Sequence, residues 1–403
     1  MTSNVFNNVA HITEESMAHL EGVLGFTKHV RRFDATMQAK GAKHGDTINI
    51  RIPETGTYRT GRIAVPDGLS DTYVPITVAQ GGADFELTSM EELLNVDSMM
   101  DRIKPRITAI ANQIDYAGLS LYTSVPQFTG VPGTLPTDLS TFLNARARLA
   151  INGVPMQDLA CVFEPYSQAS VVNGLKLVPN PVEDIGKQYK TGNLGSLAAG
   201  MAFSLDSNTL AHTVGTFGTS TPVMDGATAD GASSIVTNGW ASDASALAVG
   251  DIIEIAGVYV VNPITKKSTA QRQQFRVTAA CDDTSGAMTI AISPSIIASG
   301  KTQNVSAVPV NDAAIYVFGA NANTYQAKVS PVNMVFHKDA FGLACIDLPA
   351  KGENCHRVKA DELGLSIRAL TQYDAKTDVT LFRLDVCYGW ALLRPNFACR
   401  VQG

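Results

Sequence analysis

A run of short, strand-like segments in the middle of the chain constrains the fold more than any other feature. These segments are residues 234–237, 250–261, 273–280, 287–293 and 313–318, and apolar residues alternate with polar ones in the second and third of them. Several short strands at such regular spacing are typical of a compact barrel or sandwich. Within the second segment the alternation shifts at Gly257, which indicates a bulge or bend. The sequence therefore predicts an all-β module inside a chain whose flanks have a different pattern.

The flanks of this module have mixed α/β character. The strongest helical pattern runs from Ile103 to Leu121, where apolar residues recur at steps of four and three and form a single stripe. Pro105 fits the first turn of that helix, where its missing N–H costs nothing. A second helix is predicted from near Asp138 to Gly153. Because the mixed pattern returns after the module, we expect both flanks to belong to one discontinuous domain.

The stretch at residues 215–233 is nearly devoid of large apolar residues. Gly, Ser, Thr, Ala and Asp dominate it, and such a composition is typical of flexible connections between domains. We therefore expect a linker at the start of the β module.

Two segments near the start of the chain have too little apolar surface to form a domain alone. Residues 1–44 hold one short helical stretch, and residues 45–87 are typical of a long hairpin with a polar tip. The tip contains Arg59 and Arg62, and residues 28–62 hold eight basic residues against three acidic ones. These charges fit three interpretations: a solvated face, pairing with a neighbouring subunit, or weak contact with nucleic acid.

The sequence lacks recognisable motifs for catalysis or for metal binding. Its seven histidines and six cysteines have no metal-ligand spacing, and neither a nucleophile elbow nor a P-loop occurs. The carboxylate pairs Glu91–Glu92 and Asp361–Glu362 are adjacent in sequence, so their side chains point apart rather than toward one substrate. We therefore expect no catalytic residues, no cofactor site and no metal site, and predict that the chain is not an enzyme.

Charge and hydropathy exclude further classes of protein. A net charge of −6 argues against a dedicated nucleic-acid binder, although it permits a protein that only encloses nucleic acid. Nothing approaches the roughly 20 uninterrupted apolar residues of a membrane-spanning helix. The first residues have no basic region followed by an apolar one, so we expect no secretory signal and a protein made in the cytoplasm.

Several ordered segments of the sequence resemble a known family. They are "GDTINIRIP" at 45–53, "VPITVAQGGADFELTSMEELLNVD" at 74–97, "GDIIEIAGVYVVNP" at 250–263 and "RLDVCYGWALLRPN" at 383–396. Together with the arm, the hairpin, the long helix and the discontinuous domain, they resemble the major capsid proteins of tailed phages that have the Hong Kong 97 fold. Within that group the sequence is similar to the coat-protein family of the Salmonella phage P22.

The resemblance implies an α+β fold of the Hong Kong 97 type with an all-β, barrel-like insertion domain. The implied domains are an N-terminal arm at 1–44, an E-loop hairpin at 45–87, the spine helix with the peripheral domain and the first part of the axial domain at 88–222, the insertion domain at 223–325, and the remainder of the axial and peripheral domains at 326–403. In this family the insertion domain aids subunit folding and helps to set capsid size.

The function implied by the resemblance is that of a major capsid protein. Its copies would assemble as pentamers and hexamers into an icosahedral head around double-stranded DNA, without sequence-specific DNA binding and without a membrane. The implied partners are the chain itself, a scaffolding protein, a portal protein and, as an optional addition, a decoration protein. The implied location is the virion, after assembly in the host bacterial cytoplasm.

The same resemblance suggests contacts between subunits. Arg59 and Arg62 of the hairpin would pair with acidic residues of an adjacent subunit, and the candidates are Glu91, Glu92, Asp361 and Glu362. Three other functions stay open. An encapsulin-like cellular shell protein shares the fold but normally lacks the insertion. A tail structural protein and an enzyme with a discontinuous α/β domain are the other two.

Overall fold

The structure is a computed structural model, and it describes residues 14, 16–20, 22–34, 47–53, 56, 62, 72–90, 99–174, 199–242, 245–351, 354–360 and 364–403. The chain divides into two compact units. Unit 1 comprises Met1–Arg51, Tyr73–Leu119 and Phe341–Leu393, and unit 2 comprises Ile52–Thr72, Ser120–Ala340 and Arg394–Gly403. Both units are therefore built from segments that lie far apart in the sequence.

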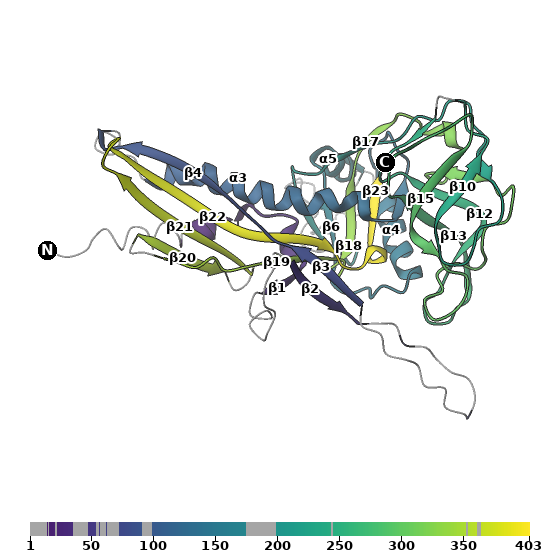
Figure 1. The fold of residues 1–403 in the computed structure, drawn as a ribbon, viewed down its shortest axis with the longest axis horizontal. Coiled ribbons are helices and arrows are strands. Elements are labelled where there is room, and N and C mark those ends of the chain that lie inside the picture. Colours follow the sequence, from purple (N-terminus) through teal and green to yellow (C-terminus); the bar gives the residue numbers. More distant parts are fainter. Residues whose placement is uncertain are drawn as a thin grey trace. The chain divides into compact units, whose positions relative to one another are not determined.

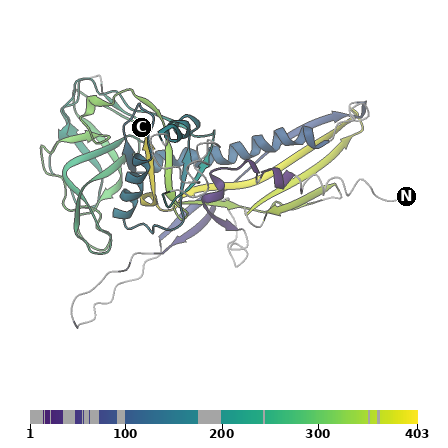
Figure 2. The same ribbon diagram turned by 180° about the vertical axis from the view of Figure 1, so that it is seen from behind.

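Unit 1 is a long sheet with one helix along it (Figures 1 and 2). The strand order is β1-β19-β22-β21-β20, and β4 pairs with β22 as well. The strands are β1 (Arg31–Asp34), β4 (Ala79–Thr88), β19 (Phe341–Cys345), β20 (Cys355–Ala360), β21 (Leu365–Asp374) and β22 (Val379–Leu392). Two further strands, β2 (Thr47–Ile52) and β3 (Thr72–Thr77), form a sheet of their own. They correspond to the base of the predicted hairpin, whose tip lies mostly outside the described residues.

The long helix of unit 1 is α3 (Met99–Leu119), which confirms the predicted apolar stripe. Ile103, Ile107 and Ile114 are almost fully buried. The position of Pro105 was predicted wrongly, because the helix begins at Met99 and the proline therefore lies inside it rather than in its first turn. Met99 lies four residues before Ile103 and continues the apolar spacing, so the pattern itself extends to the observed start of the helix.

One part of unit 2 is a five-stranded sheet, which we call the host sheet. Its order is β5-β23-β18-β6-β7. The strands are β5 (Gln127–Gly130), β6 (Leu159–Phe163), β7 (Ala202–Leu205), β18 (Asn333–His337) and β23 (Ala398–Gln402). The helix α4 (Ser140–Ile151) packs on this sheet, and α5 (Pro165–Gly174) follows β6. The predicted second helix is confirmed, and the Asp138 carboxylate accepts a hydrogen bond from the Ser140 N–H at its start.

The other part of unit 2 is the central β module, residues 223–318. Its sheet has the order β16-β12-β13-β15-β10-β9. The strands are β9 (Val223–Met224), β10 (Ala232–Asn238), β12 (Ile252–Val261), β13 (Ser268–Val277), β15 (Met288–Ile296) and β16 (Ile315–Val317), and β11 (Ala246–Leu247) pairs with β14 (Cys281–Asp282) beside them. The five segments predicted as strands are all strands, and Gly257 has φ +80° inside an irregular stretch of β12.

The central β module closes on itself, so its sheet is a barrel (Figure 1). Hydrogen bonds run from the Met224 N–H to the Ala313 carbonyl and from the Ile315 N–H to the Pro222 carbonyl, both at 2.9 Å. They join the two end strands of the sheet, β9 and β16. Closure removes the exposed strand edges on which unwanted pairing starts.

The linker predicted at residues 215–233 is wrong in its first half. Phe217 is fully buried and Met224 is 1% exposed, and both belong to the core of the central β module. These two large side chains pack in that core and fix the position of the segment, although its other residues are small and polar. A low density of apolar residues therefore does not by itself identify a linker, because the few large apolar side chains of this segment are buried.

Candidate functional site

The structure describes one of the six residues predicted to contact other subunits. Arg62 is exposed to solvent. Arg59, Glu91, Glu92, Asp361 and Glu362 lie outside the described residues, so the predicted pairing stays a prediction.

In unit 1, a segment near the N-terminus is fixed to α3 by one carboxylate. Asp115 is 2% exposed, and it accepts hydrogen bonds from the Gly25 N–H at 2.7 Å, the Thr27 N–H at 3.0 Å and the Thr27 hydroxyl. A carboxylate that accepts several hydrogen bonds in the interior is strongly bound. Asp115 therefore holds the segment around Thr27 against the helix.

Aromatic packing completes this attachment. Phe26 is fully buried, and its ring centroid lies 5.3 Å from those of Phe341 and Trp390. A Cβ atom on Gly118 would lie 2.6 Å from the Phe26 ring, so only glycine allows the helix and the ring to approach this closely. The Trp390 indole N–H donates to the Ile114 carbonyl at 3.0 Å, which joins β22 to the same helix.

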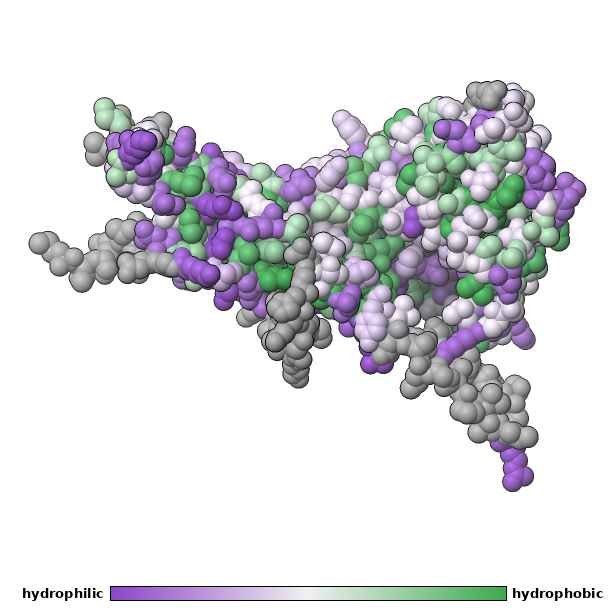
Figure 3. Space-filling view, in the orientation of Figure 1, coloured by the Kyte–Doolittle hydropathy of each residue, from purple (hydrophilic) through white to green (hydrophobic). Residues whose placement is uncertain are grey.

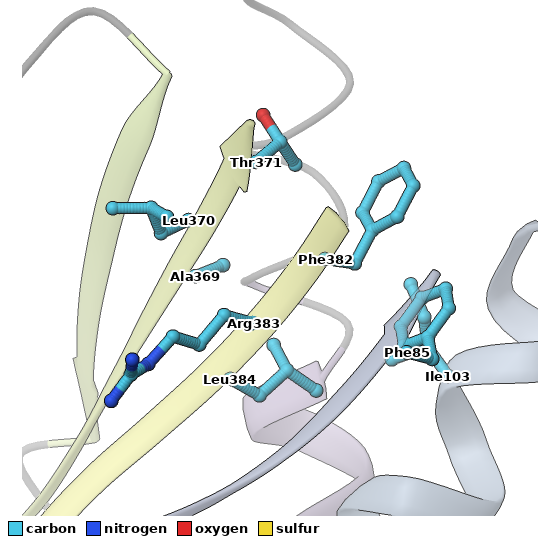
Figure 4. Close-up of a pocket in the computed structure, with 8 residues that line it drawn as sticks. All are labelled: Phe85, Ile103, Ala369, Leu370, Thr371, Phe382, Arg383 and Leu384. Atoms are coloured by element: carbon cyan, nitrogen blue, oxygen red, sulfur yellow. The ribbon is translucent and has the colours of Figure 1, made fainter. Parts of the chain in front are cut away.

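Where α3 crosses the sheet, the contact is packed and holds no ligand-sized space (Figure 4). Phe85 and Phe382 stack at 4.9 Å with their planes 6° apart, and the Arg106 guanidinium lies 4.6 Å from the Phe85 ring centre. The cavity beside them measures about 10 Å³, which is about the smallest space that holds one water molecule. In Figure 4 Phe85 and Phe382 point toward the side of Ile103, and Arg383 points away from it.

The other face of this sheet carries a buried charge cluster. Asp385 is 2% exposed, and its carboxylate accepts hydrogen bonds from Arg368 at 2.5 Å and from Arg383 at 2.8 Å. Burial alone raises the pKa of Asp385, but the hydrogen bonds from Arg368, Arg383 and Gln80 outweigh it and hold the pKa below its ordinary value. The cluster joins β4, β21 and β22, which are neighbouring strands of the sheet.

This cluster predicts a pH dependence of stability. Folding lowers the pKa of Asp385. The ionised carboxylate therefore stabilises the folded protein at pH values above the ordinary aspartate pKa of about 3.9. This stabilisation is lost as the pH falls through the lower pKa of the folded state. We expect Asp385→Asn to lower the free energy of unfolding by about 2 kcal/mol at neutral pH, and to flatten its decline below about pH 4. Urea titrations at a series of pH values measure both effects. Glu86→Gln, an exposed change on the neighbouring strand, should keep the decline, and an identical decline in Asp385→Asn and the unchanged chain would contradict the assignment.

In unit 2, an aromatic side chain of the host sheet packs into the core of the central β module. Phe128 of the edge strand β5 is 3% exposed and belongs to the core of the module, where its ring meets Phe318 edge-on at 4.8 Å. The Phe128 N–H donates to the Gln274 side chain at 2.7 Å. Gln274 is itself held by Glu254, whose carboxylate accepts from its amide at 2.9 Å. Apolar and polar contacts thus fasten the module at the same edge.

Arg148 of α4 spans the same junction. Its Nε donates to the Gln127 side chain at 2.9 Å, and its Nη2 donates to the Arg272 carbonyl of β13 at 3.1 Å. Burial lowers the pKa of Arg148 although Glu254 lies near enough to oppose the effect. An open polar hollow of about 450 Å³ lies beside it, lined by Arg148, Glu254, Tyr259, Ala270, Gln271 and Arg272.

A buried histidine and aspartate form a third contact of the junction. The ring of His212, in β8 (Ala211–Thr213), lies 2.9 Å from the Asp251 carboxylate, and both side chains are at most 3% exposed. Asp251 also accepts from the N–H groups of Gly215 and Ala248. Both oxygens of the Asp251 carboxylate are engaged by these structural partners and the pair is closed to solvent, so it fixes loops and does not resemble an acid–base site.

The described residues contain no group of three or more His, Cys, Asp or Glu side chains that could hold a metal ion. Among the helices in the described part of the chain, none is long and apolar enough to cross a bilayer. The face drawn in Figure 3 mixes hydrophilic and apolar side chains over both units. The contacts described above are therefore internal contacts that hold the parts of each unit together.

Sequence reasoning missed the residues that make these joints. Asp115, Phe128, Gln274, His212 and Arg400 belong to no motif. Arg400 did carry a signal, because it lies between Cys399 and Val401 in a strand that is otherwise typical of a fully buried one. A charged residue in such a strand marks a buried polar contact.

The chain was compared with known proteins. A family model described as the P22 coat protein, gene protein 5, matches residues 1–402. No curated protein matches the chain. Among solved structures, that of Mycobacterium phage Che8 is 12% identical, with 93% of this chain and 90% of that chain covered at a TM-score of 0.45. The capsid of the Cyanophage P-SCSP1u is 12% identical, covering 94% and 87% at 0.45. The CUS-3 coat protein I-domain is 31% identical, covering 25% and 97% at 0.19.

Proposed function

Because the chain belongs to the P22 coat protein family and is the major capsid protein of a tailed phage head, we propose that its copies assemble as pentamers and hexamers into an icosahedral shell around double-stranded DNA. The observation that carries this function is the family match, which spans residues 1–402. The match does not favour the encapsulin-like or tail-protein alternatives. The expected α+β fold of the Hong Kong 97 type is confirmed.

The chain is a structural protein of the virion and forms capsid shells with copies of itself. We further propose that it has no catalytic activity, and that assembly takes place in the host cytoplasm with a scaffolding protein, a portal protein and, where present, a decoration protein. The domain boundaries that follow from the resemblance, with an insertion domain at 223–325, are part of the same proposal. The closed barrel of the central β module supports it, because a closed module tolerates insertion into another domain.

Shell assembly demands subunits that keep their shape while they make many weak contacts. Large interfaces between subunits are built from repeated small contacts, each reversible enough to correct errors. The joints at Asp115 and Phe128 support this role, because they stiffen each unit internally. Contacts between subunits are assigned to the basic hairpin, where Arg59 and Arg62 would meet Glu91, Glu92, Asp361 or Glu362 of a neighbour.

The hairpin assignment is tested by the double variant Arg59→Ala, Arg62→Ala. We expect monomers that fold normally, judged by circular dichroism, but at least tenfold fewer particles in a sucrose gradient, because each lost charge pair is repeated around every ring. The variant Lys267→Ala, Lys376→Ala removes two exposed charges that lie outside the hairpin and serves as the matched control. Normal particle yield from the hairpin variant would contradict the assignment while leaving the family membership untouched.

A further inference from the structure

The open hollow beside Arg148 lies where the pairing of β12 with β13 is irregular. Residues 255–258 of β12 stand opposite Gln273 alone, and residues 269–271 of β13 stand opposite Val260 alone. Bulges of this kind bend the strands and interrupt their hydrogen bonding, which leaves space beside them. The hollow measures about 450 Å³, a volume typical of small-ligand sites.

Arg272 of β13 presents a guanidinium group to this hollow. Its Cζ lies 4.0 Å from the centre of the Tyr316 ring, and its Nη1 lies 3.8 Å from Oε2 of Glu254, which is beyond hydrogen-bond distance. The side chain is 38% exposed, and within the described part of the chain its N–H groups donate no hydrogen bond. An arginine held against an aromatic ring keeps its N–H groups for another acceptor.

Arg148 of α4 adds a second guanidinium group beside the backbone of Arg272. Its Nη2 donates to the Arg272 carbonyl at 3.1 Å, and its Nε donates to the Gln127 side chain at 2.9 Å. These two hydrogen bonds fix the guanidinium, while its Nη1 has no partner among the described residues and is not closed off from solvent. Both arginines therefore have donors that a molecule in the hollow can reach.

Glu254 is the one acidic residue among those that line the hollow. Its Oε1 accepts a hydrogen bond from the Gln274 amide at 2.9 Å, whereas its Oε2 accepts none from the described residues. Two arginines and one glutamate leave the hollow with a single excess positive charge. Such a site attracts an anionic group, and one negative charge balances it, whereas a second negative charge would be repelled by Glu254.

We propose that this hollow binds a carboxylate group through Arg272 and Nη1 of Arg148. A carboxylate is planar and singly charged, and its two oxygens match the parallel N–H groups of a guanidinium. Tyr259 is 37% exposed and Gln271 is exposed as well, so a phenol and an amide are available to the rest of the ligand. The carboxylate comes either from a small acid in solution or from an aspartate or glutamate side chain of a second copy of the chain.

Saturation-transfer difference NMR of the full-length, unassembled chain with succinate, at constant ionic strength, tests the proposal. We expect a succinate signal that saturates with concentration, and no saturable signal from succinamide, which has the same carbon chain without the charges. The variant Arg272→Gln should weaken succinate binding at least tenfold, because the loss of a charge-assisted hydrogen bond typically has an effect of this size.

Lys267→Gln is the matched control for Arg272→Gln. It removes one exposed positive charge from the same pair of strands, but Lys267 does not line the hollow, so the affinity for succinate should stay unchanged. Circular dichroism would verify that both variants fold. Equal affinity of Arg272→Gln and the unchanged chain, or no saturable binding of succinate, would overturn the proposal.

Glu254→Gln distinguishes a carboxylate site from a site for a cation. The change removes the negative charge beside Arg272 but keeps an acceptor oxygen for Gln274. Succinate should therefore bind severalfold more tightly to this variant. Weaker binding of succinate to Glu254→Gln would contradict the proposal independently of the Arg272 variant.

Assembled shells distinguish the two sources of the carboxylate. A succinate signal that persists in shells identifies a small acid as the ligand. A signal that is lost in shells, together with a lower dissociation temperature of Arg272→Gln shells, identifies an acidic side chain of a second copy. This comparison rests on the proposed assembly, whereas binding to the unassembled chain does not, so a failure of one is distinguishable from a failure of the other.

Discussion

Replacing Asp115 with alanine is expected to lower the free energy of unfolding by about 3 kcal/mol, because the change leaves buried N–H groups of Gly25 and Thr27 without an acceptor. This decrease in stability is larger than the decrease caused by removing an ordinary surface hydrogen bond, because the change removes a charged acceptor from the interior. The segment that carries Phe26 would then be held against α3 by aromatic packing and by the hydrogen bond between His19 and Thr108. Urea denaturation followed by tryptophan fluorescence measures the change, and Trp390 lies beside the affected contact.

Gln113→Ala provides the control for this prediction. Gln113 lies on the same helix two residues earlier and is exposed, so its truncation should change stability by less than about 0.5 kcal/mol. Asp115→Asn should fall between the two, because it keeps one acceptor oxygen. Equal stability of Asp115→Ala and Gln113→Ala would show that the segment around Thr27 is not fixed by this carboxylate.

Replacing Phe128 with alanine should cost about 4 kcal/mol, which is within the usual range for a buried phenylalanine. The ring fills a place in the core of the central β module although it comes from the edge strand of the host sheet. Its loss would open a cavity beside Phe318 and weaken the junction without touching any strand of the module itself. Urea denaturation and limited proteolysis should both report the change, with new cleavage in the module.

Val131→Ala is the control for the Phe128 prediction. It follows β5 closely and is 43% exposed, so its truncation should leave the proteolysis pattern unchanged. A Phe128→Ala chain with wild-type stability would mean that the host sheet and the module are joined by the polar contacts alone. A chain with lower stability but unchanged proteolysis would mean that the cavity weakens unit 2 evenly and leaves the junction intact.

Elements with a strong local pattern could be predicted from the sequence. The stripe from Ile103 onward indicated α3, and the alternation around Gly257 indicated a bulged strand in the central β module. Both depend on residues close together in the chain, where periodicity records which face is buried. The buried state of Phe217 was predicted wrongly, because it depends on packing against residues far away in the sequence. The start of α3 was placed too late, although Met99 continues the apolar spacing.

The joints could not be predicted for the same reason. Asp115 contacts a segment about ninety residues away, and Phe128 binds Gln274 across a still longer separation. Nothing in the local sequence distinguishes these residues from an ordinary surface aspartate or core phenylalanine. Their roles follow only once the topology places α3 beside β22 and the edge of the host sheet beside β13.

The central claim is that this chain builds a shell, and electron microscopy tests it most directly. The purified chain would be imaged by negative stain after expression alone and after expression with its neighbouring open reading frames. We predict closed shells, spirals or polyheads, with the difference between the samples showing what a scaffolding protein contributes. A uniform small oligomer in both samples would contradict the account.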